Sequence, residues 1–384
     1  MHLAARLDAI EPFYVMEIAK TAAAVAARGG APMIYLNIGE PDFSASAPVV
    51  AAAEACLKAG HTQYTQATGT PALRAAIARW YRQRWQLDID PARIVVTAGA
   101  SAALQLVCLA LFEGGDEVLM PDPCYPCNRH FVSAVGATPR LLPAGPEHRF
   151  QLDAASVQAA WNAHTRGVLL ASPSNPTGTS IDPAEMRRIV ELVRARGGVS
   201  IVDEIYLGLS YDARYGRSAL EHGEDVVSIN SFSKYFAMTG WRLGWAVLPP
   251  ALVAPVEKLA QNLYICPSTV AQEAALACFE PAAIAEYERR RGAFQRRRDA
   301  VVPGLQRLGL QVPVEPDGAF YVWADCSARH ASSWDYCLDL IARAHVALTP
   351  GRDFGPHAAE RYLRLSFASA LPQIEQALER IARL

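Results

Sequence analysis

The sequence has no long hydrophobic run and no excess of charge of either sign. No segment of its 384 residues approaches the roughly 18 uninterrupted apolar positions of a membrane-spanning helix. The net charge of −2 excludes the basic surface that nucleic-acid-binding and membrane-surface proteins usually carry. The first residues also lack the charged start and short apolar run of a secretory signal. We therefore expect a cytoplasmic protein without nucleic-acid or membrane partners.

The eight cysteines do not follow the spacing of a metal site. Cys124 and Cys127 form a CxxC pair, but a zinc ribbon requires a second pair at suitable spacing, which the sequence lacks. The other cysteines are scattered through apolar segments, as is usual for reduced, buried thiols. We expect no metal, and a redox role for this pair stays an open alternative.

Lysine is scarce. Of 36 basic side chains only four are lysines: Lys20, Lys58, Lys234 and Lys258. Unlike the guanidinium of arginine, the amine of lysine can lose its proton and act as a nucleophile. Lys234 follows an apolar segment and lies between Ser231 and Ser233. It is therefore a candidate for amine chemistry, with an ordinary surface lysine as the alternative.

The central two-thirds of the chain alternates short apolar segments with helix-period segments, a pattern typical of a mostly parallel sheet covered by helices. The predicted strands are 93–99, 117–121, 138–143, 167–173, 198–204, 226–232 and 244–249. The predicted helices are 71–85, 101–112 and 183–197. Residues from about 270 onward mix helices with short strands. The sequence thus predicts an α/β protein with a large domain and a smaller α+β domain.

Two arginine triplets, 289–291 and 296–298, lie in a segment with helical periodicity and nearby glutamates. Charged runs of this kind usually form a solvated helix face. We expect both triplets to face solvent.

Polar residues follow several predicted strands. Asn175 follows one strand, and Asp203 and Tyr206 follow another. In open α/β sheets ligands bind outside the carboxyl ends of the strands, so these side chains are candidate ligand contacts. A buried carboxylate at a strand end needs a partner, and a protonated heterocyclic nitrogen would provide one. Asn-Pro turn chemistry and helix capping are the structural alternatives for Asn175 and Asp203.

Other groups suit a phosphate close to Lys234. Ser231, Ser233 and Arg242 supply hydroxyls and a positive charge within one loop. The segment 97–101, TAGAS, places small residues between a strand and a helix, where free backbone N–H groups hold anions. An amine, a phosphate site, a buried acid, and Asn and Tyr partners for a phenolate oxygen together describe pyridoxal phosphate.

These motifs, in this order, resemble the class I and II aminotransferases, which are fold-type I pyridoxal-phosphate enzymes with aspartate aminotransferase as prototype. The resemblance covers nearly the whole chain. The matching segments are NIGEPDF (37–43), YTQATGTPALR (64–74), TAGAS, PDPCYP (121–126), SNPTG (174–178), DEIY (203–206), SFSKYFAMTGWRLGW (231–245), PDGAFYVW (316–323) and RLSFA (364–368). The resemblance implies an N-terminal arm that joins the small domain at 1–40, a cofactor-binding domain with a seven-stranded sheet at 41–270, and a small domain at 271–384.

The resemblance also implies roles at the cofactor ring. Lys234 would hold the cofactor covalently and then move the proton at the substrate Cα. Asp203 would keep the pyridine nitrogen protonated, and Asn175 and Tyr206 would bind the ring oxygen. Tyr125 would stack on the ring face.

At the phosphate, the resemblance implies contacts from two segments and from a second subunit. The implied phosphate contacts are Ser231, Ser233, Arg242 and the backbone of Ala100, Ser101 and Ala102. Tyr64 matches a tyrosine that reaches the phosphate bound by the neighbouring subunit, which implies a homodimer with shared sites.

At the substrate, the resemblance implies that Arg364 clamps the α-carboxylate through its planar fork. Asn175 would also contact the substrate, and the main chain of Gly39 would lie against the amino acid. The helix at 102–112 has no Lys or Arg for a second carboxylate, and residues 12–16, PFYVM, are apolar. We therefore expect a neutral or hydrophobic amino acid, with Arg129 or an arginine of a second subunit as the open alternative.

The expected activity is the ping-pong exchange of an amino group between an L-amino acid and a 2-oxo acid. The same fold and lysine also serve C–S β-lyases and related enzymes, so an eliminating enzyme is the first alternative. A ligand-sensing regulator on this fold is a remote one.

Overall fold

The computed structural model describes residues 2–384. The helices are α1 Tyr14–Ala26, α2 Ala47–Lys58, α3 Pro71–Trp85, α4 Ala100–Leu111, α5 Pro126–Ala134, α6 Ala154–Ala160, α7 Pro183–Ala195, α8 Pro250–Leu263, α9 Thr269–Leu276, α10 Pro281–Arg307, α11 Ser333–Asp339 and α12 Leu371–Ala382. The strands are β1 Ile34–Tyr35, β2 Ile94–Thr97, β3 Glu117–Asp122, β4 Thr138–Pro143, β5 Thr165–Ala171, β6 Val199–Asp203, β7 Val227–Ser231, β8 Gly244–Val247, β9 Tyr321–Asp325, β10 Val346–Ala347, β11 Thr349–Pro350 and β12 Tyr362–Ser366.

The central sheet has seven strands in the order β2-β8-β7-β6-β5-β3-β4. Strand β8 is antiparallel to both neighbours, and the remaining pairs are parallel. All seven strands coincide with predicted ones, so the prediction of a mostly parallel seven-stranded sheet is confirmed.

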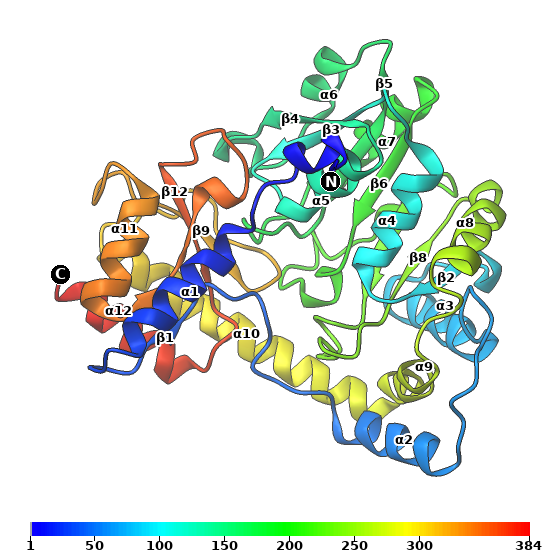
Figure 1. Ribbon diagram of the computed structural model, residues 1–384, viewed down its shortest axis with the longest axis horizontal. Helices are drawn as coiled ribbons and strands as arrows, with labels where there is room; N and C mark the ends of the chain where they lie inside the picture. Colours follow the sequence, from blue (N-terminus) through cyan, green and yellow to red (C-terminus); the bar gives the residue numbers. More distant parts are fainter. Residues whose placement is uncertain (1) are drawn as a thin grey trace.

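Helices cover both faces of this sheet (Figure 1). Along β5, Val168 and Leu170 belong to one buried core and Leu169, between them, to the other. Helices α4 and α8 pack over one face, whereas α7 contacts β6 from the opposite side. Because both faces are buried, these strands read as nearly continuous apolar segments, which made them recognisable.

The C-terminal part forms a second unit around a three-stranded antiparallel sheet, β11-β12-β9. The N-terminal segment joins this unit, because β1 pairs with β10 and α1 contacts β10 and β11. In Figure 1 the blue α1 lies among the orange and red C-terminal elements. The long yellow helix α10 runs from this unit toward α9.

The arginine triplets of α10 correct one expectation. The side chain of Arg289 is 63% exposed, but those of Arg297 and Arg298 are only 8% and 13% exposed. Arg297 donates to both carboxylate oxygens of Asp42, at 2.9 and 2.8 Å, and to the carbonyl of Ala368 at 2.6 Å. The prediction that both triplets face solvent is therefore wrong, because α10 packs against α12 and β9 and Arg297 is buried against Asp42. Among residues 2–384, no helix combines the length and the apolar character needed to cross a bilayer.

Candidate active site

A cavity of about 510 Å³ lies at the carboxyl ends of β5, β6 and β7. These strands are neighbours in the sheet, so the residues that follow them meet at one edge: Asn175 after β5, Asp203 at the end of β6, and Ser231 at the end of β7. Tyr321 and Arg364 line the same cavity from β9 and β12. The predicted site residues that line it are Gly39, Ala100, Ser101, Tyr125, Asn175, Asp203, Tyr206, Ser231, Ser233, Lys234, Arg242 and Arg364.

Two predicted residues do not line the cavity. The backbone N–H of Ala102 donates to the carbonyl of Gly99 at 3.2 Å, which leaves Ala100 and Ser101 as the cavity-lining start of α4. The side chain of Tyr64 is 80% exposed and lies on the outer surface. Within one chain, the structure therefore does not bring Tyr64 to the site.

Lys234 projects into the cavity from the loop after β7. Its Nζ donates a 2.8 Å hydrogen bond to the carbonyl of Gly39. Burial lowers the pKa of Lys234 to about 8, while the nearby carboxylate of Glu40 partly restores it and the cations of Arg364 and Arg242 lower it further. A lowered pKa leaves a larger fraction of the amine unprotonated near neutral pH, which a nucleophilic lysine needs.

Asp203 is a buried carboxylate with few hydrogen bonds or opposite charges to offset its loss of contact with water. One of its oxygens accepts the backbone N–H of Ile205 at 3.1 Å. Burial raises the pKa of Asp203 to about 7, and the charge of Lys234 opposes this only in part. A protonated ring nitrogen beside Asp203 would supply the missing positive partner. This position therefore fits the pyridine nitrogen of pyridoxal phosphate.

Tyr206 has a partner that the sequence analysis missed. The hydroxyls of Tyr206 and Tyr321 are 2.8 Å apart, and both side chains are buried. Burial raises the pKa of Tyr206 above its usual value, so the phenol is protonated at neutral pH. Tyr321 lies in the apolar segment AFYVW, whose local pattern indicates a core position and gives no sign of a hydroxyl pair.

The start of α4 and the loop after β7 form an anion-binding corner. Arg242 Nη1 donates to the hydroxyl of Ser233 at 3.4 Å, and the hydroxyl of Ser231 accepts the Ser233 N–H at 3.0 Å. No side chain caps the N-terminus of α4, which begins after Gly99. Gly99 has φ +85°, and a Cβ at this position would overlap the guanidinium of Arg242. Free N–H groups, two hydroxyls and an arginine fit a phosphate group.

Arg364 is held by hydrogen bonds on two sides and keeps one N–H group without a partner among the described residues. It donates to Asn175 Oδ1 at 2.8 Å and to the carbonyl of Asn37 at 2.6 Å. Its guanidinium also lies 4.5 Å from the ring centroid of Tyr321. Its Nε is buried without a hydrogen-bond partner among the described residues. A buried, unpartnered guanidinium N–H beside a cavity suits a substrate carboxylate.

The N-terminal segment supplies an apolar wall, which we define as Phe13, Val15, Met16 and Ile38. The ring of Phe13 meets that of Tyr125 edge-on, with centroids 6.3 Å apart. The wall therefore continues into the aromatic residue expected to stack on the cofactor.

Arg129, the alternative receptor for a second carboxylate, lies outside the cavity lining. It donates to Glu11 Oε2 at 2.9 Å and to the carbonyl of Asp353 at 3.3 Å. The carboxylate of Asp353 in turn accepts the N–H groups of Tyr14 and Val15, at 2.9 and 3.3 Å. Arg129 and Asp353 thus hold the start of α1 in place.

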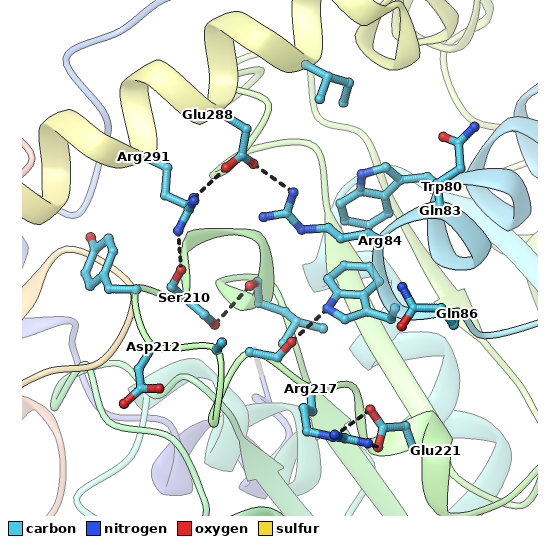
Figure 2. A pocket seen from close by; sticks show the side chains of 16 residues that line it. Trp80, Gln83, Arg84, Gln86, Ser210, Asp212, Arg217, Glu221, Glu288 and Arg291 are labelled. Carbon is cyan, nitrogen blue, oxygen red and sulfur yellow. Dashed lines mark hydrogen bonds and ion pairs between the residues drawn. The ribbon is translucent and has the colours of Figure 1, made fainter.

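A larger cleft of about 810 Å³ lies between α3, α10 and the loop after β6 (Figure 2). Five of its charged side chains form ion pairs with one another: Glu288 accepts from Arg84 and from Arg291, each at 2.7 Å, and Arg217 pairs with Glu221. This cleft offers ion pairs already formed and no side chain from the predicted site. The smaller cavity at the strand ends is therefore the candidate active site.

Comparisons with known proteins agree with this assignment. The family model for aminotransferases of class I and II matches residues 31–381. The chain is 40% identical over 373 residues to a valine–pyruvate aminotransferase of Mycobacterium tuberculosis, covering 97% of this chain and 96% of that protein. It is 36% identical over 356 residues to an arginine–pyruvate transaminase of Pseudomonas aeruginosa, covering 92% and 90%. A solved aminotransferase structure from Mycobacterium tuberculosis superposes with a TM-score of 0.96 at 39% identity, covering 100% and 98%.

Proposed function

The chain belongs to the class I and II aminotransferases, pyridoxal-phosphate-dependent enzymes, and on this premise we propose that it transfers the amino group of a neutral, aliphatic L-amino acid to pyruvate. The predicted cofactor and reaction class are confirmed by the family. The preference for the donor and the acceptor, and the role of each residue, are our proposals.

The apolar wall carries the proposal for the donor. Apart from Lys234, Arg242 and Arg364, which have other roles, no Lys or Arg of the described residues lines the cavity. Glu40 also lines it and would repel a second carboxylate. Burying an aliphatic side chain against this wall is favourable by about 25 cal/mol per Å² of apolar surface removed from water. The names of the two pyruvate-dependent relatives support pyruvate as the acceptor.

Each residue has a task in the reaction. Pyridoxal phosphate, when bound, supplies a ring that accepts the electron pair left at Cα when the substrate proton departs. Lys234 Nζ removes that proton, and its lowered pKa keeps the amine available. Asp203 holds the ring nitrogen in its protonated form. Arg364 binds the α-carboxylate through its fork and orients the Cα–H bond toward Lys234.

The remaining groups position the cofactor. Asn175 and Tyr206 would donate to the ring oxygen, and Tyr125 would stack on the ring face. The start of α4 and the side chains of Ser231, Ser233 and Arg242 would hold the phosphate. Their location around one cavity supports these roles.

We further propose a homodimer in which Tyr64 completes the phosphate site of the partner subunit. The 80% exposure of Tyr64 leaves it free for such a contact. For the domains we propose boundaries at residues 40 and 270, and the pairing of β1 with β10 supports the first of them. Light scattering of wild type and a Tyr64→Phe variant, with a cofactor titration, tests the shared site.

A panel of amino donors against pyruvate and 2-oxoglutarate tests the substrate proposal. We expect kcat/KM for valine or leucine with pyruvate to exceed that for aspartate at least tenfold. A higher kcat/KM for aspartate would contradict the proposal. Each donor alone should also convert the cofactor's visible band to that of its amino form. Release of ammonia without an acceptor would indicate an eliminating enzyme instead.

The covalent role of Lys234 has a matched control. Lys234→Ala should abolish both the visible band of the attached cofactor and the activity. Lys258→Ala, at an exposed lysine of α8, should change neither. Full activity in the Lys234→Ala variant would refute the proposed mechanism.

A further inference from the structure

Tyr321 contacts three groups of the proposed site at once. Its hydroxyl lies 2.8 Å from that of Tyr206, and its ring supports the guanidinium of Arg364 at 4.5 Å. The hydroxyl also lies directly against the main chain of Gly39, where an added Cβ would overlap it. Tyr321 is 1% exposed, so these contacts are shielded from water.

The direction of the hydroxyl pair follows from the number of hydrogens. Each tyrosine hydroxyl has one hydrogen to donate and oxygen lone pairs to accept. When Tyr206 donates its hydrogen to the cofactor's ring oxygen, it can only accept from Tyr321. Tyr321 must then donate to Tyr206, because a buried hydroxyl without a partner costs free energy.

Donation by Tyr321 changes Tyr206 as a donor. In a chain of hydrogen bonds each bond polarises the next and strengthens it by roughly 10–30%. The effect is largest where water is excluded and the final acceptor carries charge, as at a phenolate oxygen.

We propose that Tyr321 is a positioning residue that fixes the hydroxyl of Tyr206 as a donor to the cofactor's ring oxygen and strengthens that donation. This inference rests on the proposed role of Tyr206 and on the attachment of the cofactor at Lys234. It does not depend on which amino acid is the donor.

The proposal predicts a change that requires no substrate. The ring oxygen also stabilises the proton on the nitrogen that joins Lys234 to the cofactor. When Tyr206 donates a hydrogen bond to the ring oxygen, the oxygen holds the proton on this nitrogen less strongly. Weakening or removing the Tyr206 hydrogen bond therefore raises the pH at which the nitrogen loses its proton. Tyr321→Phe should therefore shift the midpoint of the visible-band titration upward by roughly 0.1 to 0.6 pH units.

The experiment is a spectrophotometric pH titration of four holoenzymes without amino acid: wild type, Tyr321→Phe, Tyr206→Phe and the double variant. We expect a small upward shift in Tyr321→Phe and a larger one in Tyr206→Phe. The double variant should titrate like Tyr206→Phe alone, because Tyr321 acts through Tyr206. Since Tyr321→Phe keeps the ring under Arg364, the affinity for a carboxylate inhibitor should stay within about twofold of wild type.

Tyr287→Phe is the matched control. The hydroxyl of Tyr287 forms a buried pair with that of Ser46 at 2.9 Å, outside the cavity. Removing it costs a comparable buried hydrogen bond and should leave the titration unchanged.

Three outcomes would overturn the inference. A Tyr321→Phe enzyme that titrates like wild type, while Tyr206→Phe is shifted, shows that Tyr321 does not act on Tyr206. Additive shifts in the double variant show that it acts by another route. If the titration midpoint of Tyr206→Phe equals that of wild type, both the inference and the proposed role of Tyr206 are overturned. The panel of amino donors still tests the proposed substrate preference separately. If Tyr321→Phe alone is poorly folded, the double variant, in which neither hydroxyl is left unpaired, still has to match Tyr206→Phe.

Discussion

Asp353 caps a helix from which it is separated by more than 300 residues of sequence. Its two carboxylate oxygens accept the N–H groups of Tyr14 and Val15 in the first turn of α1, at 2.9 and 3.3 Å. The residue at the N-cap position itself is Phe13, whose side chain makes no capping hydrogen bond. Asp353→Ala therefore removes the side-chain acceptor of two N–H groups at the start of the apolar wall.

The expected loss of stability from Asp353→Ala is larger at the start of α1 than in the global free energy of unfolding. Loss of an N-cap acceptor costs about 0.5–2 kcal/mol locally. Burial raises the pKa of Asp353 to about 6, so its charged form also carries a desolvation cost that alanine removes. We therefore expect the global free energy of unfolding to change by about 1 kcal/mol or less, while the first turn of α1 loosens.

Hydrogen exchange and steady-state kinetics measure the two consequences. Backbone amides of residues 14–17 in the holoenzyme should exchange roughly 3- to 30-fold faster in Asp353→Ala, which corresponds to the local cost. KM for an aliphatic donor should rise several-fold while kcat is largely retained, because the wall binds ground state and transition state alike. Asp353→Asn, which keeps one carbonyl acceptor, should be intermediate.

Asp335 provides the matched control, since it lies exposed in the first turn of α11 in the same part of the fold. Asp335→Ala should leave both the exchange of residues 14–17 and the KM unchanged. The reasoning is refuted if Asp353→Ala shows wild-type exchange in this segment, or if kcat falls while KM stays constant.

Three further perturbations test other parts of the site. Arg364→Lys replaces a fork with a point charge, so KM should rise roughly 10- to 150-fold for every amino donor alike, and a donor-dependent effect in kinetic assays would contradict a common carboxylate clamp. Gly99→Ala strains a position with φ +85° and crowds Arg242, so pyridoxal phosphate should bind the apoenzyme about tenfold more weakly. Fluorescence titration measures this affinity, and an unchanged value would exclude this corner as the phosphate site. Because the pKa of Asp203 is raised to about 7, its carboxyl group in the folded apoenzyme keeps a proton that the unfolded chain releases near pH 4. Asp203 should therefore make the free energy of unfolding of the apoenzyme fall as pH rises from about 4 to 7. Denaturant titrations of Asp203→Asn should show a shallower fall over the same pH range.

The sheet and most of the cavity residues could be predicted because their signals are local. Each strand is buried on both faces and reads as an apolar segment, and its carboxyl end is marked by a polar residue such as Asn175 or Asp203. Strand order then brings these ends together, as the sequence β7-β6-β5 shows. Lys234 was recognisable for a different reason, because lysine is rare in this chain.

The residues that sequence analysis missed work through contacts between distant segments. Tyr321 pairs with a hydroxyl 115 positions away, and Asp353 caps a helix 339 positions away. Arg297 lies in a charged run typical of a solvated face, yet it is buried against Asp42. In each case the local pattern was that of an ordinary core, loop or surface residue, and only the tertiary arrangement supplies the partner.

Arg129 shows why donor preference depends on packing more than on the number of cations near the cavity. The sequence left Arg129 open as a receptor for a distal carboxylate. It does lie on α5, the helix that begins directly after Tyr125. Its guanidinium is nevertheless engaged with Glu11 and with the carbonyl of Asp353, outside the cavity lining. Releasing it would leave Glu11 without its partner and would loosen the start of α1. The cation that could have received a second carboxylate therefore holds the apolar wall in place, which favours the neutral donors we propose.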